Sequence, residues 1–171
     1  WNNMFSTVHV FDNAGAEIRG VSAIEIALWD LLGQYLGQPI YNVLGGRTRE
    51  RIPVYNTCVN SGRHMDFTAF TDPTKIGDLA RSLLDQGIRR MKIWPFDFAA
   101  ELSNGHHISS GDLKKALLPF GKIRNAVGDK IDIMAELHAL WDRPNAVKIS
   151  RALEQFSPYW VEEPVFMDHL G

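Results

Sequence analysis

The sequence has little cysteine: Cys58 is the only one among its 171 residues. A disulfide within this chain is therefore impossible, and a zinc site built from several cysteines is excluded. Low cysteine usage fits a reducing compartment, so we expect the protein to be cytoplasmic.

The sequence also lacks an excess of one charge and any long hydrophobic run. It has 18 Lys and Arg against 20 Asp and Glu, a net charge of −2. We therefore expect no nucleic-acid partner and no anionic membrane surface as partner. Its apolar runs are too short to span a bilayer. With 45% hydrophobic residues, the composition is that of an ordinary globular protein.

Apolar periodicity predicts a helix that begins at Ser22, which has capping-box spacing to Glu25, and then strands that alternate with helices. The helices begin at Asp72-Pro73, at Asp112 and at Asp142. The predicted strands cover residues 52–59, 90–94, 130–135 and 159–161. The loops 60–72 and 96–111 are expected to border the substrate, and the second is longer than most strand-to-helix connections.

Strands separated by helices pair in parallel through right-handed crossovers. This leaves an open doubly wound sheet or a β/α-barrel. No Gly-x-Gly-x-x-Gly motif follows a predicted strand, which argues against a nucleotide-binding sheet. A full barrel has eight strands in about 250 residues, so four strands correspond to the first half of one.

Polar residues stand at the carboxyl end of every predicted strand, where active sites of parallel sheets form. They are Tyr55 and Asn56, Lys92 and Trp94, Glu136 and His138, and Glu162 and Glu163. Carboxylates on neighbouring strand ends repel each other unless they are protonated or bind a cation. Oxygen ligands suit Mg²⁺ or Mn²⁺ better than Zn²⁺.

Each residue alone has an ordinary explanation. Glu162-Glu163 could be an acidic pair at a helix start, His138 a hydrogen-bonded structural histidine, and Lys92 a surface residue. Their joint position at successive strand ends is what favours a metal site at Glu136 and Glu162.

Three motifs resemble the enolase superfamily, in its mandelate racemase/muconate lactonizing enzyme branch. They are AIEIALWD at residues 23–30, GQPIYNVLGG at 37–46 and WVEEP at 160–164. The resemblance implies that residues 1–46 are the end of an α+β capping domain with its linker helix. It implies that residues 47–171 are the first four β/α units of a (β/α)7β barrel, so we expect the chain to be a fragment, inactive alone.

The resemblance also implies residue roles. Glu136 stands where the family usually has an aspartate ligand, and Glu162 takes the second ligand position for Mg²⁺, or Mn²⁺. The third ligand is expected on the next strand, beyond Gly171. The family's Lys-x-Lys motif corresponds to Lys92-Ile93-Trp94 here. Lys92 matches the first lysine, but Trp94 stands in place of the second, which is usually a base.

His138, two residues after the ligand, matches the Asp-x-His of the family's mannonate and galactonate dehydratases. It is the predicted acid or base, or a hydrogen-bond partner of the substrate, with Lys92 as electrostatic support. The remaining base is expected in a His-Asp dyad on later strands. Asn56, Trp94 and Glu163 are candidate substrate contacts. The alternative for Trp94 is to fill the barrel mouth without touching the substrate, and the alternative for Glu163 is to support a metal ligand.

The resemblance therefore implies a Mg²⁺-dependent dehydratase, a hydro-lyase acting on a small carboxylate of the sugar-acid class. It would abstract the proton beside the carboxylate and eliminate water through a metal-stabilised enediolate. The alternatives are a cycloisomerase or epimerase of the same branch, or a non-catalytic protein that binds or senses sugar acids. The family commonly forms homo-oligomers, and we expect the same of the full-length protein.

Overall fold

The computed structural model describes residues 2–8, 15–58 and 75–166. The chain divides into two compact units, Trp1–Ile52 and Pro53–Gly171. The predicted helix start at Asp72-Pro73 and the whole of the predicted loop 60–72 lie outside the described residues. The boundary predicted at residue 46, with a capping domain before it, stays a prediction.

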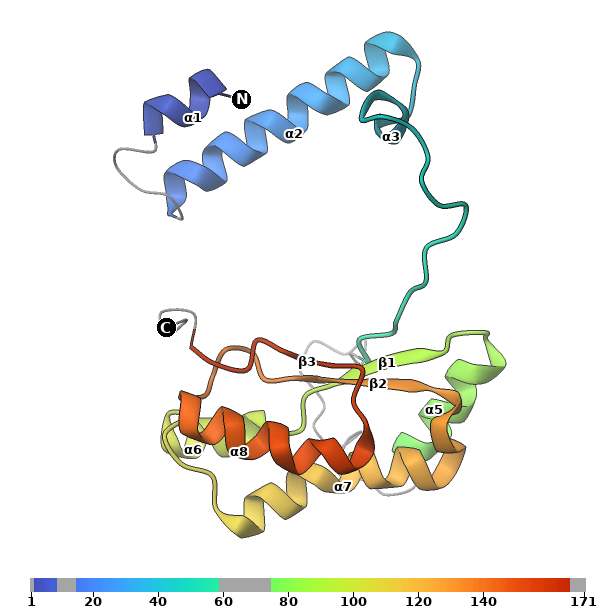
Figure 1. Ribbon diagram of the computed structural model, residues 1–171, viewed down its shortest axis with the longest axis vertical. Coiled ribbons are helices and arrows are strands. Elements are labelled where there is room, and N and C mark those ends of the chain that lie inside the picture. The colour runs from blue at the N-terminus through green and yellow to red at the C-terminus, as the bar shows by residue number, and fades with distance from the viewer. Residues whose placement is uncertain (1, 9–14, 59–74, 167–171) are drawn as a thin grey trace. The chain divides into compact units, whose positions relative to one another are not determined.

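The described part of the first unit is helical, with α1 (Asn2–Val8), α2 (Ala16–Leu36) and α3 (Ile40–Val43) (Figure 1). The predicted start of the long helix at Ser22 is wrong, because α2 already begins at Ala16 after Gly15. Gly20 resembles a turn signal in the sequence, but a glycine inside a helix costs only about 1 kcal/mol. The helix ends as expected at Gly37, whose φ of 60° suits glycine.

The apolar stripe predicted on this helix is present, but most of it is exposed. Its exposed members are Ile24, Leu28, Leu31 and Leu32, with 39% to 62% of their surface accessible. Among the described residues, no helix is both long enough and apolar enough to cross a bilayer.

The second unit has a parallel sheet with its helices on one face (Figure 1). Its elements are α5 (Lys75–Asp85), β1 (Arg90–Ile93), α6 (Asp97–Ser103), α7 (Ser110–Val127), η1 (Gly128–Lys130), β2 (Asp132–Glu136), α8 (Arg143–Leu153), η2 (Glu154–Phe156) and β3 (Trp160–Glu162). The strands lie in the order β1-β2-β3, and both pairings are parallel. The predicted α/β fold with parallel strands is thereby confirmed.

The first predicted strand, over residues 52–59, is not a strand in the part that the structure describes. Asn56 alone pairs with β1: its N–H donates to the Arg90 carbonyl, and its carbonyl accepts from the Lys92 N–H. Cys58 turns into the left-handed region with φ 57°. This turn ends the extended backbone two residues after Asn56, so the segment does not continue the sheet.

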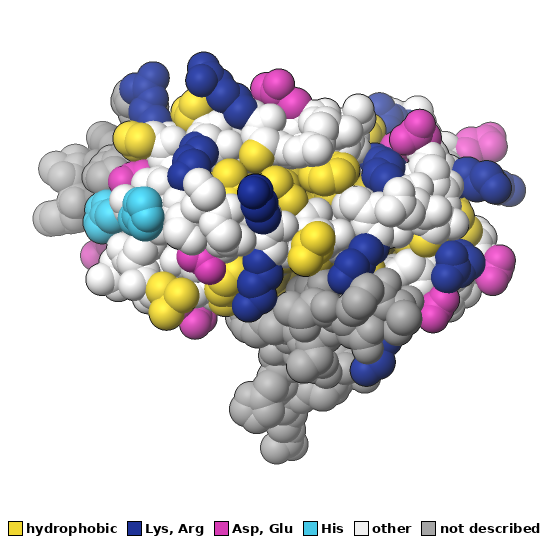
Figure 2. Space-filling view, turned by 90° about the horizontal axis from the view of Figure 1, so that it is seen from below, with side chains coloured by type: hydrophobic (Ala, Val, Ile, Leu, Met, Phe, Trp, Pro, Cys, Tyr) yellow, Lys and Arg dark blue, Asp and Glu magenta, His cyan; other side chains and the backbone are white. Residues whose placement is uncertain are grey.

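Alternate strand residues face the helices and form the core with them. Met91, Ile93, Ile133 and Ala135 are fully buried in this layer. The face seen from the helix side carries lysines and arginines scattered among hydrophobic and acidic side chains, with no area of one sign (Figure 2). Lys92, Glu136 and Glu162 alternate with core residues along their strands, so their side chains point to the opposite face of the sheet.

Local signals explain most helix boundaries. The Ser109 hydroxyl accepts from the Asp112 N–H at the start of α7, and the Asp142 carboxylate accepts from the Asn145 N–H at the start of α8. The start predicted at Asp142 is confirmed, while α7 begins two residues before the predicted Asp112. The predicted loop 96–111 contains α6, which is too short to show periodicity in the sequence.

Gly105 joins the segment after α6 to the segment after β2. Its carbonyl accepts from the Asp142 N–H, and its φ is +75°. A Cβ at this position would overlap the Leu140 carbonyl. Only glycine allows this approach, which holds two strand-end segments together.

We expect Gly105→Ala to lower the free energy of unfolding by about 3 kcal/mol, because it adds a steric overlap to an unfavourable φ. Gly87→Ala is the matched control, since Gly87 has a φ of +79° with nothing within 4 Å of the added Cβ. It should lose only about 1 kcal/mol. Urea denaturation measures both, and equal losses would contradict the close contact.

Candidate active site

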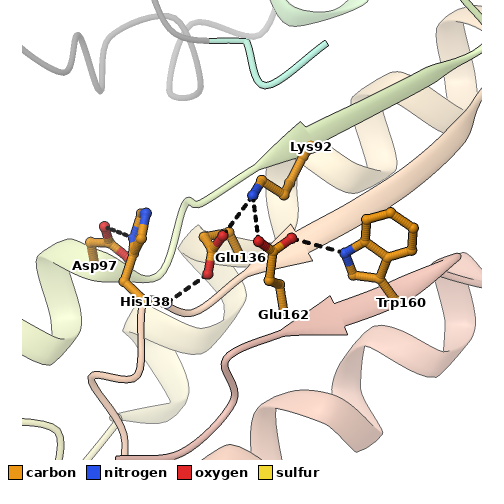
Figure 3. A network of polar contacts seen from close by, with 6 residues as sticks. All are labelled: Lys92, Asp97, Glu136, His138, Trp160 and Glu162. Atoms are coloured by element: carbon orange, nitrogen blue, oxygen red, sulfur yellow. Dashed lines mark hydrogen bonds and ion pairs between the residues drawn. The ribbon is translucent and has the colours of Figure 1, made fainter. Parts of the chain in front are cut away.

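Three charged side chains converge at the carboxyl edge of the sheet: Lys92 from β1, Glu136 from the end of β2 and Glu162 from the end of β3 (Figure 3). Glu136 and Glu162 are partners in the strand register, so they leave neighbouring strands at the same level. Lys92 is level with Met134, which lies two residues before Glu136 on β2. Residues two apart on a strand point the same way, so the long lysine side chain reaches forward to both acids.

The lysine lies between the two acids. Its Nζ is 2.7 Å from Oε2 of Glu136 and 2.8 Å from Oε1 of Glu162. Lys92 and Glu136 are buried, with 7% and 3% of their surface exposed, whereas Glu162 is partly exposed. Buried charges need such pairing, because isolated ones lose their hydration without compensation.

The pairing moves the pKa values of the charged groups apart. Burial acts to lower the pKa of Lys92, but the hydrogen bonds and charges of Glu136 and Glu162 outweigh it and raise this pKa above its ordinary value. Burial acts to raise the pKa of Glu162, but the hydrogen bond and charge of Lys92 outweigh it and lower this pKa. At neutral pH the lysine is therefore an ammonium and Glu162 is a carboxylate.

Each carboxylate also accepts a second hydrogen bond. Oε1 of Glu136 accepts from the backbone N–H of His138 at 3.0 Å. Oε2 of Glu162 accepts from the indole Nε1–H of Trp160, also at 3.0 Å. Each of the four carboxylate oxygens thus accepts a hydrogen bond, and these bonds fix the orientation of both acids at the sheet edge.

His138 lies in a tight turn directly after β2. His138 and Ala139 have φ values of 50° and 52°, in the left-handed region that few residues other than glycine adopt. The Ala139 N–H donates to the Glu163 carbonyl at 2.8 Å, which fixes this turn against the segment after β3. Unfavourable backbone of this kind is held by its surroundings and often occurs at functional sites.

Asp97 is a site residue that the sequence interpretation missed. It is the first residue of α6, it is 3% exposed, and its Oδ2 lies 2.8 Å from Nδ1 of His138. Its place just after β1 was a signal for it, since acids at strand ends were the criterion for the other site residues. Instead, residues 96–111 were interpreted only as a loop.

The structure places the other predicted residues around this group. Trp94 is buried, and its ring packs edge-on against the His138 ring with 5.9 Å between centroids. The side-chain oxygen of Asn56 accepts from the Cys58 N–H at 2.6 Å, within its own turn. Glu163 is exposed, with a φ of 43°. Their roles toward a substrate stay predictions.

The donor set fits part of a divalent-cation site. Glu136 and Glu162 supply hard oxygen atoms in register. The Lys92 ammonium is itself a cation bound between these two carboxylates. Within the described residues, no group of three or more His, Cys, Asp or Glu side chains could hold a metal. These residues therefore offer two protein ligands for a cation such as Mg²⁺, and the third ligand expected beyond Gly171 stays a prediction.

The Enolase C-terminal domain-like family matches residues 75–171. D-gluconate dehydratase of Thermoproteus tenax is 34% identical over 145 residues, which are 85% of this chain and 27% of that protein. The 3,6-anhydro-alpha-L-galactonate cycloisomerase of Streptomyces coelicolor is 26% identical over 170 residues, 99% of this chain and 41% of that protein. The crystal structure of an enolase of the mandelate racemase subgroup from Agrobacterium tumefaciens is 48% identical with a TM-score of 0.78, over 90% of this chain and 38% of that one. The chain thus spans well under half the length of these proteins.

We expect Lys92→Met to lower the free energy of unfolding by about 3 kcal/mol at pH 7, because it leaves two adjacent carboxylates without a countercharge. Lys130→Met is the matched control, since Lys130 is exposed. It should change stability by less than about 0.5 kcal/mol. Urea denaturation at low salt measures the difference.

The loss at Lys92 should depend on pH in a defined window. The pKa of folded Glu162 is below its ordinary 4.5, so its stabilisation is complete above 4.5 and is lost as the pH falls through the lowered pKa. The pKa of folded Lys92 is above its ordinary 10.5, so its stabilisation is complete below 10.5 and is lost as the pH rises further. A loss as large at pH 3 as at pH 7 would contradict the pairing.

Proposed function

Because the chain belongs to the Enolase C-terminal domain-like family, we propose that it contributes to the cation-dependent dehydration of a sugar acid. The proton beside the substrate carboxylate is removed, and a hydroxyl leaves the neighbouring carbon as water. The observation that carries this proposal is the convergence of Lys92, Glu136 and Glu162 beside His138 at the strand ends (Figure 3). The name of the gluconate dehydratase relative supports the substrate class.

Glu136 and Glu162 would hold Mg²⁺, or Mn²⁺ in its place. Such a cation, when bound, offsets the charge of the substrate carboxylate and stabilises the negative charge that develops when the proton leaves. The two acids suit this task because their orientation is fixed by hydrogen bonds from His138 and Trp160. Preorganised ligands need little rearrangement when the ion binds.

Lys92 acts as a fixed positive charge in this proposal. Its bonds to both acids raise its pKa, which supports a role as an ammonium that attracts the substrate carboxylate rather than as a base. Trp94, at the position where the family's second lysine stands, has no basic group. Racemisation with one base on each face of the substrate is therefore disfavoured.

His138 is the acid or base that the chain itself supplies. Its ring stands beside the acids, and its backbone N–H is bonded to Glu136. A protonated imidazole can donate to the leaving hydroxyl, and a neutral one can accept the proton beside the carboxylate. A hydrogen bond to the substrate without proton transfer is the alternative role.

Two other functions have a specific observation in their favour. The Streptomyces coelicolor relative is named a cycloisomerase, which supports an isomerase of the same branch. Trp94 in place of a base supports a non-catalytic protein that binds sugar acids. A homo-oligomeric, cytoplasmic protein with a small carboxylate as its ligand is part of the proposal in each case.

The test is dehydration of a library of aldonic and aldaric acids by the protein as it is naturally made, with Mg²⁺ and with chelator. We expect a keto-deoxy acid to form from at least one substrate, and only with the metal. Isomerised product without loss of water would support the isomerase. Binding of metal and acid without turnover would support the non-catalytic protein, and either result overturns the dehydratase.

We expect His138→Asn to lower kcat by about 100-fold or more, the usual loss when a general acid or base is removed. Arg151→Gln is the control, because Arg151 is exposed and lies in the last turn of α8, outside the predicted site. It should leave kcat unchanged. Equal effects of the two variants would remove His138 from the reaction.

A further inference from the structure

The contact between Asp97 and His138 joins the segments that follow β1 and β2. Oδ2 of Asp97 lies 2.8 Å from Nδ1 of His138, and the two residues are 41 apart in the sequence. The other ring nitrogen of His138 points away from Asp97 (Figure 3). The family resemblance implied a His-Asp pair on later strands. Asp97 and His138 form a second pair of this kind, within the described residues.

Asp97 is a buried acid whose hydrogen-bonding partner is His138. Its other oxygen, Oδ1, is buried with no hydrogen-bond partner in the described part of the chain. Burial raises its pKa, and the charge and hydrogen bond of His138 act in the opposite direction. Burying this carboxylate is costly, and its hydrogen bond in the described part of the chain is to one imidazole nitrogen of His138. Its effect on that imidazole explains its burial.

The remaining contacts of His138 hold it from other sides. Its backbone is in the left-handed region and donates to Glu136, and its ring packs against Trp94. Among the described residues, Nε2 of His138 makes no hydrogen bond. Only this ring nitrogen is left to meet a substrate.

A second His-Asp contact in the chain shows the contrast. His106 lies 3.3 Å from Asp142, and its side chain is 65% exposed. Asp142 caps α8 through the Asn145 N–H, so helix capping explains that acid. The N-cap of α6 is Phe96, without a side-chain cap, so Asp97 has no equivalent task.

We propose that Asp97 is the positioning residue of His138: it accepts the hydrogen bond from Nδ1–H and thereby presents Nε2 to the substrate. This inference rests on the proposed function, in which His138 gives or takes a proton. The carboxylate selects one tautomer and one ring orientation, as an acid behind a catalytic histidine does in other enzymes. Asp97 itself touches no reacting atom.

The test uses Asp97→Asn, with Asp85→Asn as the matched control, because Asp85 is an exposed acid at the end of α5. Histidine labelled with ¹⁵N reports the tautomer, and the His138 signal is assigned by its loss in His138→Asn. We expect a single Nδ1–H tautomer in the wild type and in Asp85→Asn. Asp97→Asn should show a mixture or the other tautomer, because its amide can donate to Nδ1 as well as accept.

Kinetics provide the second measurement. We expect Asp97→Asn to lower kcat by about 10- to 100-fold while KM stays close to the wild-type value, since ground-state binding does not need the tautomer. Asp85→Asn should match the wild type. A purely structural role would lower the thermal midpoint without changing the tautomer, and that result would overturn the inference.

The wild type alone suffices if Asp97→Asn does not fold. An Nε2–H tautomer of neutral His138 in the wild type would overturn the inference. If the protein dehydrates no sugar acid and yet the tautomer changes in Asp97→Asn as expected, positioning is supported and the dehydratase fails. The two proposals can therefore fail separately.

Discussion

The ammonium of Lys92 between two carboxylates is the interaction on which the rest of the site depends. Glu136 and Glu162 leave neighbouring parallel strands at the same level, so their charges are close whether or not anything neutralises them. Each bonds to Lys92 at 2.7–2.8 Å. A site that concentrates acids in this way favours cations, and the lysine keeps it folded by offsetting part of that charge.

The fold supplies this arrangement through its strand ends and the turns behind them. Parallel pairing brings three carboxyl ends to one edge of the sheet. The turn at His138 and Ala139 has unfavourable backbone angles, yet it is held by hydrogen bonds to Glu136 and to the segment after β3. Gly105 brings the segment after α6 onto the same region. Rigid strands thus present the acids, and connected segments present the histidine.

The sequence predicted the parallel α/β fold and brought together Lys92, Glu136 and His138, because strand ends can be located from periodicity alone. It did not predict Asp97, although this acid follows a strand end as the other site residues do, because the short helix α6 shows no periodicity and the contact with His138 spans 41 residues. It also predicted a strand over residues 52–59, where the apolar pattern is right but the turn at Cys58 ends the pairing after Asn56. A tertiary contact decided the first case, and local backbone geometry decided the second.

We propose that Glu136 and Glu162 form a divalent-cation site. Anomalous diffraction from crystals of the naturally made protein grown with Mn²⁺ tests it most directly. The account predicts an anomalous peak at about 2.2 Å from a carboxylate oxygen of each acid, in the range of hard-cation coordination. The same peak should be absent when both acids are replaced by glutamine. A peak bound elsewhere, or none at these carboxylates with Mn²⁺ in excess, would contradict the account.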